Sequence, residues 1–354
     1  MSDLFSHIEQ KYQIAGVLNE DVQISAAGQS NAAYQFTQSG GSGAANTETA
    51  LARYYTGSIE FINGATGGSA LLEANSADGI NQWINSDGSF GAAYSTWTSS
   101  VSGKTIRAIL WDQGEQDGQQ IGSTSFAVPT AQQRSDYKAG LVQLFSQMRS
   151  MVGNVPIVIC PIGRRTANHS GFQTIREIQK ELSKEMNNVF IMAGKSHYTL
   201  SDSVHLDQAG REALGTLQGN TIAQLLGKTD TFKTLPPDII GVSRSGTTVT
   251  ITIQPAEGTN FTPTNAIEGF SFWQGAYPSQ GISPNQISWA VLPSRTNATT
   301  ITGTLSGTPT GDEYLVYQLG SMNGINPAQL VIDTGNVPLA SSVWADSGSG
   351  FNEI

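Results

Sequence analysis

Three side chains in this 354-residue sequence have the chemistry of nucleophilic catalysis: Ser30, Asp202 and His205. A serine hydroxyl is a weak nucleophile at neutral pH and needs an adjacent base, and histidine is the usual base because its pKa lies near 7. Asp202 lies three residues before His205, so its carboxylate can hold one ring nitrogen while the other faces the serine. These residue types therefore predict a catalytic triad.

Each member of this triad also has a simpler interpretation. The segment Gly28-Gln29-Ser30-Asn31 would suit an ordinary turn. Asp202 could cap a helix, although Asp207 is the better-placed cap, and His205 could be a structural histidine. The catalytic interpretation is favoured because further chemically capable residues follow the other strands of the same region.

Acyl transfer also develops an oxyanion, which needs hydrogen-bond donors. The sequence offers three candidates: the backbone N–H of Ser30, the backbone N–H of Gly67 and the side-chain amide of Gln113. A glycine lets the backbone approach a substrate closely. Gly67 could instead belong to a tight turn, and Gln113 could be a structural hydrogen-bonding residue.

Other polar residues are weaker candidates for a direct role in the chemistry. Glu115 and Asp117 could form an acid pair for glycoside cleavage or a metal site, but a structural role beside Arg164 or Arg165 is favoured. The remaining histidines are interpreted as ordinary residues: His7, His169 and His197. The single cysteine, Cys160, excludes an internal disulfide and is interpreted as a buried residue of a core strand.

The elements that must position these residues alternate between strand and helix up to about residue 228. Apolar runs predict five strands at residues 22–28, 58–65, 105–114, 155–163 and 189–194. Helical patterns lie between them at residues 47–55, 131–153, 172–186 and 207–227. This alternation predicts a five-stranded parallel sheet between two helical layers, with the active site at the carboxyl ends of the strands.

The sequence after Pro236-Pro237 has a different pattern. Short strand-like runs are separated by turn residues, which is typical of a β-sandwich. We therefore expect two domains, residues 1–228 for the catalytic unit and residues 229–354 for an all-β accessory unit. Three aromatic residues of the second unit could line a sugar-binding face, although a core role is favoured: Trp273, Tyr277 and Trp289.

The composition narrows the possible partners. The formal net charge is -10, which disfavours nucleic acid and anionic membranes and leaves sugars or esters open. Charged residues make up only 13% of the chain, which favours a protein that works outside the cell or in a virion-like particle. No signal peptide and no transmembrane run are visible, so a cytoplasmic location stays open.

Four short blocks carry a family resemblance: "GQSN", "TGGSA", "WDQGEQD" and "DSVH". In this order they resemble the blocks of the SGNH (GDSL-like) hydrolase superfamily, in the branch of acetylxylan esterases and sialate O-acetylesterases. The resemblance covers about residues 20–228. It implies a flavodoxin-like α/β/α fold, Ser30 as nucleophile, His205 as base and Asp202 as its partner. It also implies that Ser30, Gly67 and Gln113 form the oxyanion hole.

Two departures from the family pattern concern the surroundings of the site. The glycine of the second block could be Gly67 or Gly68, and Gly67 is preferred. The third block begins Trp111-Asp112, where the branch often has Trp-His, so contacts behind the site are expected to differ.

The sequence thus predicts a serine esterase that removes O-acetyl groups from carbohydrate through an acetyl-serine intermediate. No metal or organic cofactor is expected. The substrate is expected to be an acetylated carbohydrate or a small ester, and the oligomeric state is left open. A broad short-chain carboxylesterase is one alternative. A phage-tail or particle-borne protein that binds or deacetylates glycan is another.

Overall fold

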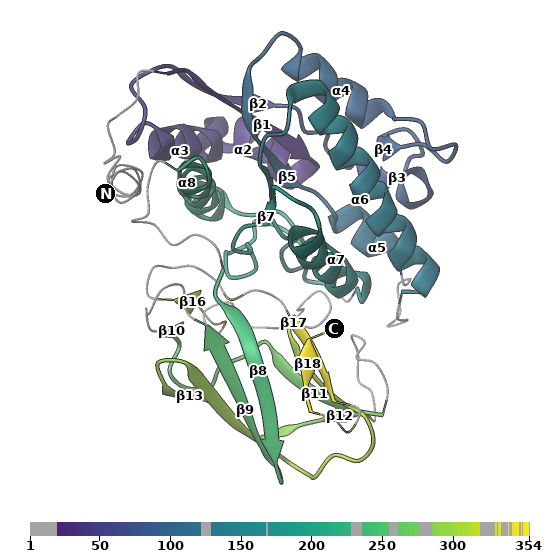
Figure 1. Ribbon diagram of the computed structural model, residues 1–354, viewed down its shortest axis with the longest axis vertical. Helices are drawn as coiled ribbons and strands as arrows, with labels where there is room; N and C mark the ends of the chain where they lie inside the picture. Colours follow the sequence, from purple (N-terminus) through teal and green to yellow (C-terminus); the bar gives the residue numbers. More distant parts are fainter. Residues whose placement is uncertain are drawn as a thin grey trace, which may run out of the picture.

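The computed structural model describes most of the chain (Figure 1). The described residues are 20–121, 129–167, 169–227, 236–254, 261–275, 285–318, 330, 332–333, 339, 342–346, 348 and 350–353. His7, Tyr277 and the predicted boundary at 228/229 lie outside these residues.

A five-stranded parallel sheet forms the centre of the first region (Figure 1). Its strands are β1 (Val22–Gly28), β2 (Ile59–Asn63), β5 (Ile106–Asp112), β6 (Ile157–Ile159) and β7 (Val189–Ile191). They are arranged in the order β2-β1-β5-β6-β7, and every neighbouring pair is parallel. Counted along the sheet this is the order 2-1-3-4-5 of flavodoxin-like folds. The predicted fold class is therefore confirmed.

Helices cover both faces of this sheet because its strands are apolar on both faces. In β5, Ile109 and Trp111 pack into the core on one face, whereas Ala108 and Leu110 pack into the core on the other. The first face is covered by α4 (Ala92–Val101), α6 (Ala131–Val152) and α7 (Gly171–Glu185). The second is covered by α3 (Ser42–Leu51) and α8 (Gln208–Leu225), which lie on the opposite side of the sheet in Figure 1.

Shorter elements occupy the carboxyl edge of the sheet and its surroundings. Helix α2 (Ser30–Thr37) follows β1 after one residue, and α5 (Glu115–Gln120) follows β5 after two. Two short strands pair in parallel, and two 3-10 helices complete the region: β3 (Ala70–Leu72), β4 (Gln82–Ile84), η1 (Gln38–Gly41) and η2 (Glu73–Asn75). The sequence analysis did not predict α2, α4 or α5.

The C-terminal region is β-rich, as predicted, and contains two larger antiparallel sheets that share one core. One sheet has the order β13 (Trp289–Asn297), β14 (Thr300–Leu305), β9 (Thr248–Gln254) and β8 (Asp238–Ser245). The other has the order β12 (Gln286–Ile287), β11 (Phe270–Gln274), β15 (Glu313–Tyr317), β17 (Ser342–Asp346) and β18 (Asn352–Glu353). A separate pair joins β10 (Phe261–Thr262) to β16 (Ile332–Asp333).

Two of the three aromatic residues proposed for a sugar-binding face lie in the described residues, and neither is fully exposed. Trp273 is only 1% exposed and packs with Val316 in a small cluster separate from the sandwich core. Trp289 packs against the sandwich core, and its indole N–H donates to the backbone carbonyl of Phe270 at 3.0 Å. Their position agrees with the core role rather than with an exposed platform for sugar rings.

Helix α7 joins the two regions through basic residues one turn apart, a contact that we term the α7 junction: Arg176, Lys180 and Lys184. The Arg176 guanidinium donates to the backbone carbonyl of Gln318 at 2.6 Å. Glu353 accepts from Lys180 at 2.5 Å and from Lys184 at 2.6 Å. Residues four apart lie on one face of a helix, so these three side chains contact the C-terminal region from the same face of α7. Arg176 also donates to the backbone carbonyl of Gly163 in the first region.

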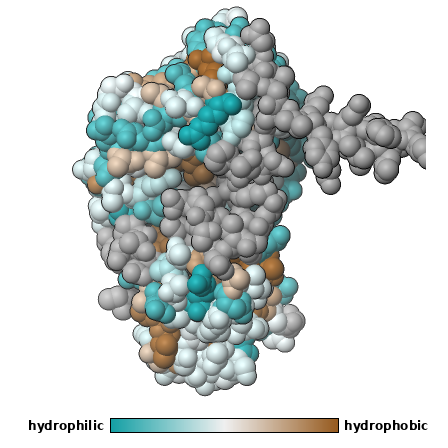
Figure 2. All heavy atoms as spheres, turned by 90° about the vertical axis from the view of Figure 1, so that its left-hand side faces the viewer, coloured by the Kyte–Doolittle hydropathy of each residue, from teal (hydrophilic) through white to brown (hydrophobic). Residues whose placement is uncertain are grey.

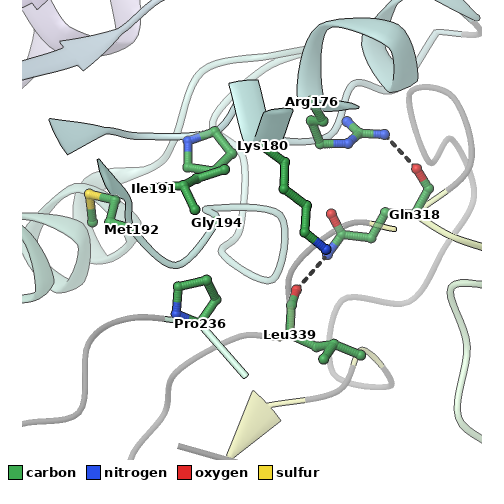
Figure 3. Close-up of a pocket in the computed structure, with 9 residues that line it drawn as sticks. Arg176, Lys180, Ile191, Met192, Gly194, Pro236, Gln318 and Leu339 are labelled. Atoms are coloured by element: carbon green, nitrogen blue, oxygen red, sulfur yellow. Dashed lines mark hydrogen bonds between the residues drawn. The ribbon is translucent and has the colours of Figure 1, made fainter. Parts of the chain in front are cut away.

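A narrow cavity lies at the α7 junction (Figure 3). Figure 3 shows Lys180 and Gln318 converging on it from the two regions, with the Gln318 amide directed to the backbone carbonyl of Leu339. None of the predicted site residues lines this cavity.

The visible surface carries no large hydrophobic patch in the described residues. Figure 2 shows small, separate hydrophobic patches among hydrophilic residues and residues of intermediate hydropathy on the described part of one face. None of the helices in the described ranges is long and apolar enough to cross a membrane.

Candidate active site

The backbone turn before Ser30 brings this residue to the carboxyl edge of the sheet. β1 ends at Gly28, whose φ is +143°, and a Cβ at this position would lie 2.0 Å from the carbonyl oxygen of Asp112 on β5. Only glycine fits both conditions, so the chain can turn sharply against the neighbouring strand. Ser30 is then the first residue of α2, at the edge where the sequence predicted the chemistry.

The structure brings the three predicted triad residues into one hydrogen-bonded chain. The hydroxyl Oγ of Ser30 lies 2.8 Å from Nε2 of His205. Nδ1 of the same ring lies 2.7 Å from Oδ2 of Asp202. Because an ionised carboxylate can only accept, Nδ1 carries the proton and Nε2 is free to accept from the serine.

The hydrogen bonds around Asp202 keep it ionised. Partial burial acts to raise the pKa of Asp202, but hydrogen bonds from the backbone N–H groups of His205 and Val204 and from the His205 ring outweigh it and hold the pKa below its ordinary value. The side chain of Asp202 is 51% exposed, whereas that of His205 is 19% exposed. Asp202 is therefore an anion whose position is fixed by three donors.

Neighbouring residues hold the loop that carries the histidine. Tyr34, one turn after Ser30 on α2, places its ring centroid 4.5 Å from that of His205. The backbone N–H of Thr166 donates to the carbonyl of Ser203 at 3.0 Å. Asp207 is the N-cap of α8 and accepts from the N–H of Gly210, so it fills the capping role that was the alternative for Asp202.

Gln113 lies directly after β5 but is fully buried. Its amide nitrogen donates to a carboxylate oxygen of Asp117 and, at 3.4 Å, to the backbone carbonyl of Ser69, while its amide oxygen accepts from the Tyr137 hydroxyl at 3.1 Å. To serve an oxyanion, the amide would have to release the longer bond to Ser69. Its role as an oxyanion donor stays a prediction.

The glycine loop after β2 is anchored beside the end of β1. The N–H of Thr66 and the hydroxyl of Ser69 both donate to the carbonyl of Gly28, at 3.0 and 3.2 Å. Gly67 and Gly68 lie between these anchors and are exposed, and a Cβ added to either would meet no other described atom within 4 Å. Gly68 has a φ of +71°, so its conformation favours glycine, and the choice between the two as donor stays a prediction.

Glu115 and Asp117 do not face each other as an acid pair, because each has its own partners. Glu115 Oε1 lies 2.9 Å from Nζ of Lys195, so its cationic partner is this lysine and not Arg164 or Arg165. Asp117 accepts from the backbone N–H of Leu71 at 2.8 Å and from other groups around the glycine loop. In the described ranges, no three His, Cys, Asp or Glu residues gather as metal ligands.

Sequence reasoning missed two residues behind the site, Asn31 and Lys195. Asn31 directly follows the serine, and its amide contacts both Glu115 and the loop that carries His205. Lys195 lies in the segment after the last strand, where a lysine so close to an apolar run is a detectable signal. Both contact Glu115, and these contacts depend on the way in which β1, β5 and β7 end at one edge.

The partly buried imidazole of His197 predicts a pH dependence of stability. Burial lowers its pKa to about 4, while an unfolded chain would have the ordinary value of 6.5. Between pH 4 and pH 6.5 the unfolded chain binds more protons than the folded chain does. The contribution of His197 to the free energy of unfolding is therefore intact above pH 6.5 and is lost as the pH falls through about 4. We expect the loss at pH 4 to be roughly 3 kcal/mol.

This prediction is checked by urea unfolding of the wild type and His197→Gln at pH 7, 5.5 and 4. The wild type is expected to lose stability relative to the variant as the pH falls. A stability difference that stays constant over this range would contradict the prediction.

Comparisons with known proteins bear on what this geometry does. A family model described as "Carbohydrate esterase, sialic acid-specific acetylesterase" matches residues 33–224, which is more than half of the chain. This match includes Gly67, Gln113, Asp202 and His205 and begins just after Ser30. No curated protein matches the sequence significantly.

Solved structures resemble the fold. A carbohydrate acetylesterase from Xanthomonas citri is 13% identical with a TM-score of 0.66, and the match covers 91% of this chain and 80% of that protein. A carbohydrate esterase family 3 protein from Talaromyces cellulolyticus is 11% identical with a TM-score of 0.42, covering 59% of this chain and 100% of its own. A carbohydrate esterase family 2 enzyme from Corynascus thermopiles (Myceliophthora fergusii) is 14% identical with a TM-score of 0.40, covering 59% and 68%. Only the first score is high enough to indicate a shared fold across both regions.

Proposed function

Because this chain belongs to the carbohydrate esterase family described as sialic acid-specific acetylesterases, and so to the SGNH hydrolases, we propose that it removes O-acetyl groups from carbohydrate through an acetyl-serine intermediate. As a member of this esterase family, the protein is a carboxylic ester hydrolase. The observation that carries the proposed mechanism is the chain of hydrogen bonds from Ser30 Oγ through His205 to Asp202, at 2.8 and 2.7 Å.

Acylation begins at the serine hydroxyl. Ser30 Oγ attacks the carbonyl carbon of the acetyl group while Nε2 of His205 takes the hydroxyl proton. The ring is then a cation, and the carboxylate of Asp202 stabilises it at Nδ1. When the tetrahedral intermediate collapses, the bond to the sugar oxygen breaks and His205 returns the proton to that oxygen. The free sugar leaves, and the acetyl group stays on Ser30.

Deacylation repeats the same steps with water. His205 takes a proton from a water molecule whose oxygen attacks the acetyl carbon. The bond to Ser30 Oγ then breaks, the proton returns to the serine, and acetate leaves. Tyr34 supports both steps because its ring packs against His205 and restricts the rotation of the imidazole.

The proposed oxyanion hole consists of the backbone N–H groups of Ser30 and Gly67 and the side chain of Gln113. Gln29, the N-cap of α2, makes no side-chain bond to its own helix. Its side chain instead accepts from the N–H of Gln116 at 3.1 Å. The first N–H groups of α2 are thus left for another acceptor, which supports the proposed role of the Ser30 backbone.

Gln113→Ala is expected to lower kcat by roughly 10²- to 10³-fold, because it removes one donor to the charge that develops in the transition state. KM is expected to change little. The measurement is steady-state hydrolysis of p-nitrophenyl acetate. An effect mostly on KM would place Gln113 in substrate binding and would contradict the oxyanion role.

The proposed substrate class is tested by acetate release from an O-acetylated sialic acid glycan, acetylated xylan and p-nitrophenyl acetate, beside p-nitrophenyl esters of longer chains. We expect an acetylated carbohydrate to be hydrolysed with the highest kcat/KM, with a sharp decrease beyond the acetyl ester. Equal rates on longer esters and no preference for a sugar would favour the broad short-chain esterase instead.

A glycan-binding protein on a phage tail or other particle was the second alternative from the sequence. Its supporting features were the low charge and the β-rich C-terminal region. The described aromatic residues of that region are largely buried, and no comparison favours this alternative. The intact arrangement of Ser30, His205 and Asp202 supports an active esterase.

A further inference from the structure

The strongest unexplained feature of the molecule is a buried charged cluster directly behind the serine. Lys195 is 1% exposed and contacts two carboxylates that are equally buried, Asp112 and Glu115. Burying charge is costly, and a cluster of this kind persists only where its geometry and hydrogen bonds compensate. Burial raises the pKa of Asp112 to about 6. For Glu115, the lysine and a hydrogen bond from Asn31 outweigh burial and hold the pKa below its ordinary value.

One oxygen atom connects this cluster to the residue beside the nucleophile. Oε1 of Glu115 lies 2.9 Å from Nζ of Lys195 and also accepts from Nδ2 of Asn31 at 2.8 Å. Because the carboxylate can only accept, it requires the nitrogen end of the Asn31 amide to face it. Asn31 is 4% exposed, so water does not compete for this contact.

The Asn31 amide in turn holds both neighbours of the histidine. Its Nδ2 donates to the backbone carbonyl of Val204 at 3.3 Å, and its Oδ1 accepts from the backbone N–H of Leu206 at 3.4 Å. Val204 and Leu206 flank His205, and Asn31 adjoins Ser30. The Asn31 amide therefore links the segment that carries Ser30 to the residues on both sides of His205.

From this geometry we propose that Glu115, held by Lys195, is a positioning residue that orients the Asn31 amide and thereby fixes His205 at hydrogen-bonding distance from Ser30. The inference rests on the proposed function, because it concerns the same triad. Asp112 touches the same lysine but has no contact with Asn31 in the described part of the chain. The two carboxylates are therefore distinguishable by experiment.

The experiment compares Glu115→Met with Asp112→Leu. Each substitution removes one carboxylate at similar side-chain length and leaves Lys195 with one ionised partner. We expect Glu115→Met to lower kcat by roughly 10- to 100-fold with little change in KM, because a misaligned base costs rate and not substrate affinity. Asp112→Leu is expected to keep kcat close to the wild type. Glu115→Gln, which keeps an acceptor for Asn31, is expected to recover part of the loss.

A second readout needs no carbohydrate. A fluorophosphonate forms a covalent bond between phosphorus and Ser30 Oγ and releases fluoride, so its rate reports how well His205 activates the serine. We expect this rate to fall in Glu115→Met and not in Asp112→Leu. Lys180→Met at the α7 junction, a buried lysine with several acceptors, is the matched control for a general loss of stability and is expected to keep the labelling rate.

Equal losses in Glu115→Met and Asp112→Leu would overturn the inference and leave the proposed function intact. If Glu115→Met does not fold, Asn31→Ala replaces it, and an unchanged kcat in that variant would overturn the inference. A folded wild type that neither hydrolyses an ester nor reacts with the fluorophosphonate would overturn the proposed function, and the inference with it.

Discussion

Ser30→Ala is expected to lower kcat for ester hydrolysis by roughly 10⁴- to 10⁶-fold while the chain still folds. The substitution removes only Oγ, whose partner is Nε2 of His205 at 2.8 Å, and leaves the turn at Gly28 unchanged. Whatever rate is left comes from the oxyanion donors and from substrate binding. The measurement is kcat on p-nitrophenyl acetate, with thermal unfolding to show that the variant is folded.

The covalent intermediate gives this prediction an independent check. Acid quenching during turnover should trap an acetyl group on the peptide that contains Ser30 in the wild type, and mass spectrometry should find none on this peptide in Ser30→Ala. Substantial hydrolysis by a folded Ser30→Ala protein would reject Ser30 as the nucleophile.

His205→Ala is the second large effect and is expected to be nearly as damaging as Ser30→Ala, because the serine loses its base in both chemical steps. The double variant Ser30→Ala/His205→Ala should be no slower than either single variant, since the two residues act as a unit. The matched control is His169→Ala, another partly buried histidine, which should keep kcat. An additive loss in the double variant would contradict a shared mechanism.

Asp202→Asn is expected to lose less than His205→Ala, roughly 10²- to 10⁴-fold in kcat. The backbone donors that hold Asp202 can still hold an asparagine, so the ring keeps part of its orientation. A loss as large as that of His205→Ala would show that the charge of Asp202, and not its position, dominates.

Local patterns in the sequence predicted much of the fold and singled out the three residues that the structure joins by hydrogen bonds, Ser30, His205 and Asp202. The five strands of the parallel sheet are apolar on both faces, so their runs are continuous and easily found. Asp202 and His205 are three residues apart, and their contact is local. By contrast, α2 begins without a side-chain cap, and half of its eight residues are Ser, Asn, Thr or an aromatic of modest helix propensity at its two ends, so its short sequence does not distinguish it clearly from a turn.

Contacts across the sheet could not be predicted in the same way. Asn31 and Glu115 are 84 residues apart, and they meet only because β1 and β5 are neighbours that end at the same level. The sequence analysis placed Glu115 and Asp117 beside Arg164 or Arg165. The partner of Glu115 is instead Lys195, which lies in the segment after β7 and also contacts Asp112 at the end of β5. The same registers bury Gln113, which periodicity does not reveal.

The α7 junction has a consequence for how this protein can be divided or recombined. A chain cut at the proposed boundary after residue 228 would uncover Arg176 and Lys180, which are 2% and 7% exposed in the whole chain, and would remove their acceptors in the C-terminal region. Arg176 would keep the backbone carbonyl of Gly163, and water would solvate both cations. Separating the two regions therefore turns the α7 junction into a basic surface in contact with water, and a foreign partner would have to offer acceptors to cover it.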